Sequence, residues 1–345
     1  MNYRPVFIAG CDRSGTTLLG DLLGCSPWAI TTPESQFIHE LLLHLQLNTF
    51  DTPRAATHWL LNHFRYAAWN LTLTTVELEQ LLILDDPRAT IESIVKEYVK
   101  QFHADKLNAD VWVDHTPDNF KYYSQLKSLF PDARFIHIVR DGRAVCASIR
   151  GLDWGPNNAY MSSRHWAERL QQALIVEGAE AENCVRVRYE DLITRPHEIL
   201  AQLCEFIDIP FDETMTKGGG LVVPDFTRTQ HYLVGQAPKA EKAYQWQSQL
   251  SQQELRDFES YPFSHLFLKK MGYKTEFESP PRLSAPHILY CYTHEFISYI
   301  FNRFRHRRME HREVARIKSL QETKTTAKLT HTRAFAHASN SRKVE

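Results

Sequence analysis

The chain has 345 residues, of which 43% are hydrophobic and 23% charged, so it can form one large α/β domain or two smaller ones. Its formal net charge of −1 excludes a global attraction to nucleic acid, and we expect no nucleic-acid partner. The six cysteines form no C-x-x-C pair and no paired spacing, which argues against a zinc site or a disulfide framework and favours a reducing compartment.

The ends of the sequence bear on localisation. An apolar strand is predicted within a few residues of Met1, which leaves no room for a signal peptide. No stretch reaches the roughly 18 uninterrupted apolar residues of a membrane-spanning helix. We therefore expect a cytoplasmic protein.

The first elements in chain order are a short apolar strand over residues 5–9, which ends at Gly10, and a helix over residues 16–23 with leucines on one face. A second apolar segment, residues 28–31, precedes Thr32-Pro33-Glu34-Ser35. This pattern predicts a helix capped by Thr32, with Pro33 in its first position and a helical pattern over residues 37–47.

Residues 48–104 are predicted to be mostly helical, as an insertion over part of the site. Three further strands are predicted at residues 111–114, 134–139 and 185–189, with helices between them. The alternation of strands and helices indicates βαβ units and a parallel sheet. Residues after 196 read as helical again, and the globular pattern ends near Pro280-Pro281.

The stretch from Gly10 to Thr17, GCDRSGTT, has the G-x-x-x-x-G spacing of a phosphate-binding loop. Backbone amides at the helix start, the helix dipole, and hydroxyl groups would form an anion site. Thr16 stands where nucleoside triphosphatases carry a lysine, and the nearest cation is Arg13. One arginine with several hydroxyls suits a phosphosulfate bound without a metal. The alternative is a glycine-rich turn that binds nothing.

The second informative segment is FIHIVRDGRAVCAS, residues 135–148. Its strand delivers Arg140 at the carboxyl edge of the sheet, and Ser148 follows two helical turns later. Both side chains could therefore converge on one anion. Taken alone, the segment also fits a turn and a helix start, with Asp141 as the cap and the arginines in surface ion pairs.

Together, R-S-G-T-T-L at residues 13–18 and an Arg–Ser pair eight residues apart resemble the sulfotransferases that use 3′-phosphoadenosine 5′-phosphosulfate (PAPS). The resemblance extends to residues 185–212, Trp246 and Met271-Gly272-Tyr273, covers about residues 4–275, and is greatest to the tyrosylprotein sulfotransferases and many bacterial enzymes. It implies a three-layer, P-loop-like α/β fold, with a central parallel sheet flanked by helices. The sulfotransferase domain would span residues 1–275, and residues 276–345 would form a basic, partly helical C-terminal extension.

The resemblance also implies an activity. The protein would transfer a sulfuryl group from PAPS, as co-substrate, to a hydroxyl group of a protein tyrosine, a sugar, a lipid or a small molecule. In this family the first loop holds the 5′-phosphosulfate, and the Arg–Ser pair holds the 3′-phosphate. The nucleotide-binding residues that it implies are Arg13, Ser14, Gly15, Thr16, Thr17, Leu18, Arg140, Ser148 and Tyr189.

Three catalytic residues follow from the resemblance: Glu34, Arg13 and His115. Glu34 lies where the family's general base falls, and a hydroxyl acceptor needs such a base to remove its proton. The alternative is that Glu34 only favours a helix dipole. His115 stands where the family often has a lysine near the bridging oxygen. It either replaces that lysine or packs at the end of a strand.

No metal is expected, because the 17 histidines show no H-E-x-x-H or comparable ligand spacing. A P-loop kinase-like phosphotransferase is one alternative, weakened by Thr16 in the lysine position. A catalytically weak, sulfotransferase-like binding protein is another. The sequence does not indicate the acceptor or the oligomeric state.

The C-terminal segment is strongly basic. Residues 301–345 contain 12 Lys/Arg and 4 Asp/Glu, a surplus of 8, so the rest of the chain carries −9. Residues 287–308 place aromatic and aliphatic residues at helical spacing. They could bind an anionic membrane or a partner, or pack on the catalytic domain through Ile288, Tyr292, Phe296 and Ile300. Polar composition predicts disorder beyond Leu320.

Overall fold

The computed structural model describes residues 3–106, 109–223 and 234–341, with side chains described through Ser319. These residues divide into two compact units. One comprises residues 1–34 and 106–308 and contains the sheet, and the other comprises residues 35–105 and 309–345. The division of the chain at residue 275 stays a prediction.

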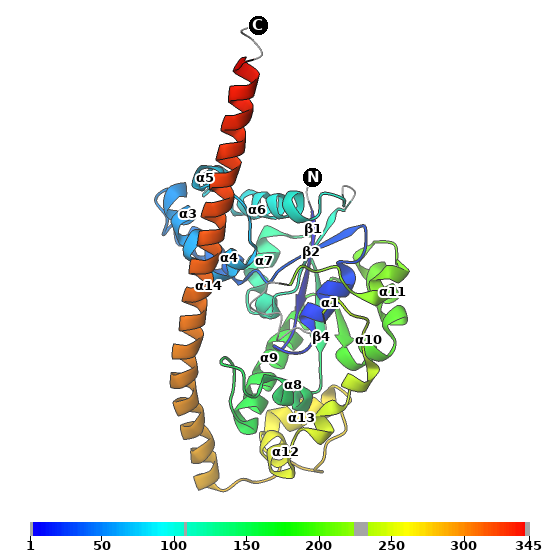
Figure 1. Ribbon diagram of the computed structural model, residues 1–345. Coiled ribbons are helices and arrows are strands. Elements are labelled where there is room, and N and C mark those ends of the chain that lie inside the picture. The colour runs from blue at the N-terminus through cyan, green and yellow to red at the C-terminus, as the bar shows by residue number, and fades with distance from the viewer. Residues whose placement is uncertain (1–2, 107–108, 224–233, 342–345) are drawn as a thin grey trace. The chain divides into compact units, whose positions relative to one another are not determined.

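A parallel sheet of five strands lies at the centre of the first unit, in the order β2-β3-β1-β4-β5 (Figure 1). The strands are β1 (Arg4–Ala9), β2 (Ala29–Thr32), β3 (Val111–Asp114), β4 (Arg134–Val139) and β5 (Cys184–Arg188). Every pair of neighbours is parallel. The predicted α/β architecture is therefore confirmed, with each strand within one residue of its predicted bounds.

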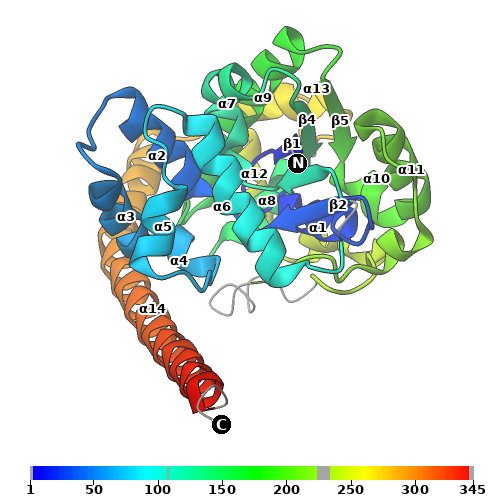
Figure 2. The same cartoon turned by 90° about the horizontal axis from the view of Figure 1, so that it is seen from above.

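Helices cover both faces of this sheet (Figure 2). Those of the first unit are α1 (Thr16–Leu23), α7 (Tyr123–Leu129), α8 (Gly142–Ile149), α9 (Ala159–Ala179), α10 (Tyr189–Thr194), α11 (Pro196–Ile207), α12 (Gln252–Glu259) and α13 (Pro262–Lys270). Short 3₁₀ turns are η1 (Pro117–Phe120), η2 (Glu213–Lys217), η4 (Ala240–Lys242) and η5 (Gln245–Ser248).

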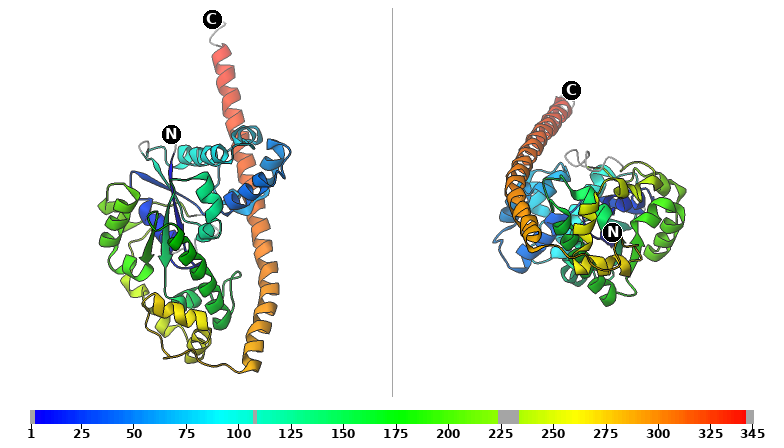
Figure 3. Two further views of the ribbon diagram at one scale, coloured as in Figure 1. Left: turned by 180° about the vertical axis from the view of Figure 1, so that it is seen from behind. Right: turned by 90° about the horizontal axis from the view of Figure 1, so that it is seen from below.

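Strands β1 to β4 are buried on both faces, so alternate side chains enter two different layers, whereas Arg186 of the edge strand β5 is exposed. Val6, Ile8, Ile136 and Ile138 pack with leucines of α1 and α11 on one face. Aromatic rings fill part of the other face, where the Phe7 ring lies 5.7 Å from that of Trp112. On that face α9 lies against β4 and β5, as the view from behind also shows (Figure 3).

A buried ion pair network joins α8 to the helices near the end of this unit. Arg143 donates hydrogen bonds to Asp141 (2.8 Å), to Glu259 of α12 (3.0 Å) and to the carbonyl oxygen of Lys274 (2.8 Å). Its guanidinium carbon also lies 4.2 Å from the centre of the Trp246 ring. Because Arg143 and both carboxylates are buried, their charges depend on one another.

The second unit is helical. Its helices are α2 (Gln36–Gln46), α3 (Pro53–Asn62), α4 (Phe64–Ala68), α5 (Thr75–Leu81) and α6 (Pro87–Phe102), with the last part of α14 (Ala285–Ser341). Phe37, Tyr66, Trp69 and Tyr98 form its aromatic core, with ring centres 5.1–5.4 Å apart. The mostly helical character expected of residues 48–104 is confirmed. That they cover part of the site stays a prediction.

Helix α14 belongs to both units and is drawn in orange to red in Figure 1. It continues as a helix to Ser341, past Leu320, where we expected order to end. Of the residues expected to pack on the catalytic domain, Phe296 and Ile300 are exposed, so that prediction is wrong for these two side chains. Ile288 is half-buried, and the Tyr292 ring does contact α9, with its centre 6.0 Å from that of Tyr160. Among the described residues, no helix has both the length and the apolar content needed to cross a membrane.

We predict that Arg143→Met strongly destabilises the first unit. Methionine retains much of the side-chain volume but leaves the carboxylates of Asp141 and Glu259 buried without their cation. The expected loss in free energy of unfolding is about 3–5 kcal/mol, measured by urea denaturation. Arg150→Met is the control, because the ion pair of Arg150 with Glu254 is partly exposed and is worth about 1 kcal/mol or less. Equal losses in the two variants would contradict the role of the buried network.

Candidate active site

The predicted site residues come from all five strands of the sheet. The loop with Arg13 follows β1, Glu34 follows β2, His115 follows β3, Arg140 follows β4, and Tyr189 follows β5. Carboxyl ends of parallel strands meet at one edge, where α/β proteins bind their ligands. The sheet topology therefore brings these residues, distant in sequence, to the same edge.

The loop after β1 has a backbone that few residues adopt. Arg13 has a φ of 67° and Gly15 a φ of 102°, both in the left-handed region. The amide of Ser14 donates to the carbonyl oxygen of Cys11 (3.0 Å), and the first α1 hydrogen bond runs from Leu19 to Gly15 (2.9 Å). The amides of the first helical turn, residues 16–18, are thus left at the helix N-terminus, where the dipole favours an anion.

Arg13, Arg140, Ser148 and Tyr189 form one connected cluster. Arg140 donates to the carbonyl oxygen of Arg13 (2.8 Å), and Nε of Arg13 donates to Oγ of Ser148 (3.1 Å). The guanidinium carbon of Arg140 lies 4.3 Å from the centre of the Tyr189 ring. Burial and the charge of Arg140 lower the pKa of Arg13, while Glu34 acts in the opposite direction. Two cations are therefore held together in a partly buried place.

Gly15 permits the close approach of Tyr189. A Cβ atom at this position would lie 2.6 Å from Cδ2 of the tyrosine ring. No real side chain accepts such a contact without movement, and the left-handed φ adds a second cost. Glycine is therefore required here both by the backbone and by the neighbouring ring.

Several buried polar atoms at this edge have no hydrogen-bond partner among the described residues. They are Oγ of Ser14, both ring nitrogens of His115 and Nε of Arg140. Burial lowers the pKa of His115, and the charges of Glu34 and Asp114 only partly oppose this. His115 is thus predominantly neutral at neutral pH, with one N–H to donate. Buried donors of this kind fit a site for an anion.

Glu34 is half-buried and close enough to influence the charges of both Arg13 and His115. The helix expected to begin at Pro33 begins instead at Gln36, with Ser35 as its N-cap. Thr32 is the last residue of β2 and pairs with Asp114, so it is not free to cap a helix. Glu34 consequently lies in the connection between strand and helix, and the reading of it as a first-turn residue is wrong.

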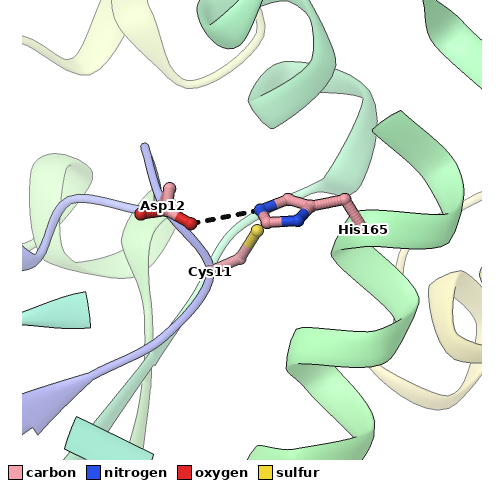
Figure 4. Close-up of side chains that lie close together, drawn as sticks. All are labelled: Cys11, Asp12 and His165. Atoms are coloured by element: carbon pink, nitrogen blue, oxygen red, sulfur yellow. Dashed lines mark hydrogen bonds and ion pairs between the residues drawn. The ribbon is translucent and has the colours of Figure 1, made fainter. Parts of the chain in front are cut away.

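A second cluster behind the loop was missed by the sequence analysis. Cys11, Asp12 and His165 lie together, and Nε2 of His165 is 3.1 Å from Oδ2 of Asp12 (Figure 4). Arg169 lies 3.5 Å from the same oxygen. Burial disfavours the imidazolium, but Cys11 and Asp12 more than offset this and raise the pKa of His165 to about 10. No local pattern signals this cluster, because His165 is 153 residues from Asp12.

The donor atoms of Cys11, Asp12 and His165 lie within 4.8 Å of one another, close enough for a metal ion. The guanidinium of Arg169 beside Asp12 supplies a positive charge that opposes a metal there. The expectation of an enzyme without metal stays a prediction. In the structure, this cluster instead anchors the loop to α9 through charged hydrogen bonds.

The chain is similar to known proteins in both sequence and fold. The model of a family described as the sulfotransferase family matches residues 5–213. Protein-tyrosine sulfotransferase A of Caenorhabditis elegans is 24% identical over 299 residues, which cover 81% of this chain and 70% of that protein. The protein-tyrosine sulfotransferase of Drosophila melanogaster is 24% identical over 294 residues, which cover 81% of this chain and 54% of that protein.

A solved structure has the same fold. The sulfotransferase domain from the curacin biosynthetic pathway superimposes with a TM-score of 0.54 at 20% sequence identity. The match covers 80% of this chain and 99% of that domain.

We predict that Gly15→Ala destabilises the protein more than Gly151→Ala does. Both glycines have positive φ, but a Cβ at Gly151 meets nothing within 4 Å. The control variant should lose only about 1–2 kcal/mol of unfolding free energy, from backbone strain. Gly15→Ala should lose about 1–3 kcal/mol more, because its methyl group meets Tyr189. Urea denaturation measures both, and equal losses would refute the contact.

A second prediction concerns pH. Because the folded state raises the pKa of His165 from about 6.5 to about 10, it binds a proton that the unfolded chain releases between these values. The stability contributed by His165 is complete below about pH 6.5 and is lost as pH rises through about 10. His165→Gln should therefore be most destabilising at pH 6 and nearly neutral above pH 10, in urea unfolding across that range.

The control for this pH series is His197→Gln. His197 forms an exposed ion pair with Glu213, so its substitution should change stability little at any pH. A loss for His165→Gln that does not vary with pH would show that His165 acts through packing and not through its charge.

Proposed function

Because the chain belongs to the sulfotransferase family, with residues 5–213 matching that family's model, we propose that it transfers a sulfuryl group from PAPS to a hydroxyl acceptor. One observation carries this proposal: the connections after all five strands bring cations, hydroxyls, a carboxylate and buried donors that are unpaired among the described residues to one edge of the sheet. The identity of the donor and the roles of individual residues are part of the proposal.

Each end of the donor has a matching group. The amides of residues 16–18, with the hydroxyls of Ser14, Thr16 and Thr17, would hold the 5′-phosphosulfate. Arg140 and Ser148 would hold the 3′-phosphate. Arg140 is already oriented by the carbonyl oxygen of Arg13, and Ser148 by Nε of Arg13. Little rearrangement is then needed before the nucleotide binds.

The chemical step is an in-line displacement at sulfur. Glu34 takes the proton of the acceptor hydroxyl, and the acceptor oxygen forms a bond to sulfur. The bond between sulfur and the bridging oxygen breaks, and its electron pair stays with adenosine 3′,5′-bisphosphate. Arg13, the loop amides and a ring N–H of His115 stabilise the charge that develops on the bridging oxygen.

Of the two alternatives for His115, its surroundings favour a hydrogen-bond donor that replaces the family's lysine. Both of its ring nitrogens are buried without a partner among the described residues, which is costly for a residue that only packs. Burial lowers its pKa, so it would donate as a neutral imidazole. The compensating positive charge would come from Arg13.

The acceptor is proposed as a hydroxyl compound. The relatives from Caenorhabditis elegans and Drosophila melanogaster are described as protein-tyrosine sulfotransferases, which favours a phenolic hydroxyl within this class. A phenol is also the easier nucleophile for a carboxylate base, because its pKa is near 10.

A thermal-shift panel tests the donor. Adenosine 3′,5′-bisphosphate should raise the melting temperature, because it fits both anion sites, whereas Mg-ATP should not, because no lysine is present in the loop. The same panel with Arg140→Met should show equal stabilisation by adenosine 3′,5′-bisphosphate and by 5′-AMP. The preference for the bisphosphate over 5′-AMP should fall tenfold or more, because the variant loses a charge-assisted hydrogen bond worth about 1.5–3 kcal/mol.

The control for the panel is Arg134→Met. Arg134 begins the same strand that ends before Arg140, so it lies at the opposite edge of the sheet. Its substitution should leave the preference for the 3′-phosphate unchanged. Stabilisation by Mg-ATP in place of the bisphosphate would instead support a kinase-like phosphotransferase.

Glu34→Gln tests the general base. The variant keeps the shape of the side chain but cannot accept a proton, so turnover with labelled PAPS and a phenolic acceptor should fall about 10²–10⁴-fold. Stabilisation by adenosine 3′,5′-bisphosphate should remain, and the exposed Glu198→Gln should behave like the unmodified protein. Unchanged turnover would remove Glu34 from the mechanism, and binding of nucleotide without turnover in the unmodified protein would favour a binding protein.

A further inference from the structure

The first part of α14, residues 285–308, presents two different faces. One face contacts the loop before α9, in the same compact unit. The carboxylate of Glu295 accepts from the backbone amide of Asn157 (2.8 Å) and from its side chain (3.1 Å). Asn158 donates to the carbonyl oxygen of Cys291 (2.9 Å), and Asn302 donates to Asn157 (2.8 Å). Polar contacts therefore hold this face of the helix to the unit.

The opposite face is apolar and exposed. Its large side chains are 39–69% exposed and follow the helical repeat: Leu289, Phe296, Ile297, Ile300, Phe301 and Phe304. Measured at 100° per residue, this group centres about half a turn away from Cys291, Glu295 and Asn302. The helix thus directs its polar side to the protein and its apolar side outward, the reverse of an ordinary surface helix.

Such an outward apolar face indicates an interaction surface. The face extends over residues 289–304, which is about 24 Å of helix at 1.5 Å per residue. It is too short and too polar on its other side to cross a bilayer, but it has the length and form of a helix that lies in a membrane interface.

The charges around this apolar face indicate which kind of partner binds to it. Arg303, Arg305, Arg307 and Arg308 are exposed at the end of the apolar stretch. The only acidic residue in the segment 285–308 is Glu295, which is engaged on the opposite face. Arginine can extend its charged end to lipid headgroups while its aliphatic part remains in contact with apolar surface.

A second copy of the chain fits this face less well. The same face of the second copy would bring the same arginines and no carboxylate to pair with them, so a parallel arrangement of two helices opposes like charges.

We propose that the outward face of α14, residues 289–308, binds the surface of an anionic lipid bilayer. The apolar side chains insert to the level of the acyl chains, and the arginines contact the headgroups.

Cosedimentation of the full chain with vesicles tests this surface. The protein should pellet with vesicles of phosphatidylcholine mixed with phosphatidylserine, should pellet far less with phosphatidylcholine alone, and should be released at high salt. Arg303→Gln with Arg308→Gln should weaken binding about 30-fold, at about a fivefold loss for each arginine near the surface.

The apolar half of the surface is tested by Phe301→Gln with Phe304→Gln. Glutamine keeps the helix but removes apolar area, so binding to anionic vesicles should fall at least 100-fold. The matched control is Ile175→Gln, which replaces an exposed apolar residue of α9, 66% exposed, outside this face and should leave binding unchanged. Circular dichroism and melting curves show that each variant stays folded.

Two outcomes would overturn the proposal. In one, the double phenylalanine variant binds anionic vesicles as well as the unmodified protein. In the other, the unmodified protein does not bind anionic vesicles. If analytical ultracentrifugation then finds a dimer that the phenylalanine substitutions dissociate, the face is assigned to a second copy of the chain.

Discussion

Because all five strands run parallel, their carboxyl ends meet at a single edge, and the connection after each strand supplies a side chain to the same place. The loop after β1 supplies backbone amides and Arg13, and the connections after β3 and β4 supply His115 and Arg140. Without this common direction, residues from opposite halves of the domain could not meet at one place. The position of every proposed catalytic group follows from this one constraint.

Assembling the site has costs in stability. Arg13 and Gly15 adopt left-handed backbone, two cations lie close together, and buried donors remain without partners among the described residues. The surrounding structure compensates for these costs. Layers of aliphatic and aromatic side chains cover the two faces of the sheet, and the Arg143 network joins α8, which carries Ser148, to α12. A rigid frame of this kind keeps strained groups in a geometry that the chain would otherwise leave.

The cluster of Cys11, Asp12 and His165 extends this support to the loop itself. It connects two loop residues to α9, a helix that also contacts the sheet, α8, α12 and α13. In helix α14, polar contacts likewise hold one face of the helix to the protein, and they leave the opposite face exposed for the membrane surface that we propose. In the loop and in α14 alike, hydrogen bonds to an element distant in sequence determine which side chains are available for binding.

The sequence by itself determined the strands of the sheet and the residue types of the loop after the first strand. The sequence predicted all five strands to within one residue. For β1 to β4, burial on both faces leaves a continuous apolar signal, whereas the edge strand β5 alternates valine with arginine. Glycine spacing and Thr16 in the lysine position indicated an anion site. Local pattern failed at Thr32 and Pro33, where strand pairing with Asp114 outweighed a good helix-capping sequence.

Only the tertiary structure decided the pairing of residues far apart in the chain. The contact of His165 with Asp12, the stacking of Arg140 on Tyr189, and the outward apolar face of α14 all depend on how separate elements pack. Periodicity in a sequence gives the two faces of a helix, but it does not say which face is buried. In α14 that choice depends on the polar groups of the loop before α9, which form hydrogen bonds with Glu295 and Asn302 and so leave the apolar face exposed.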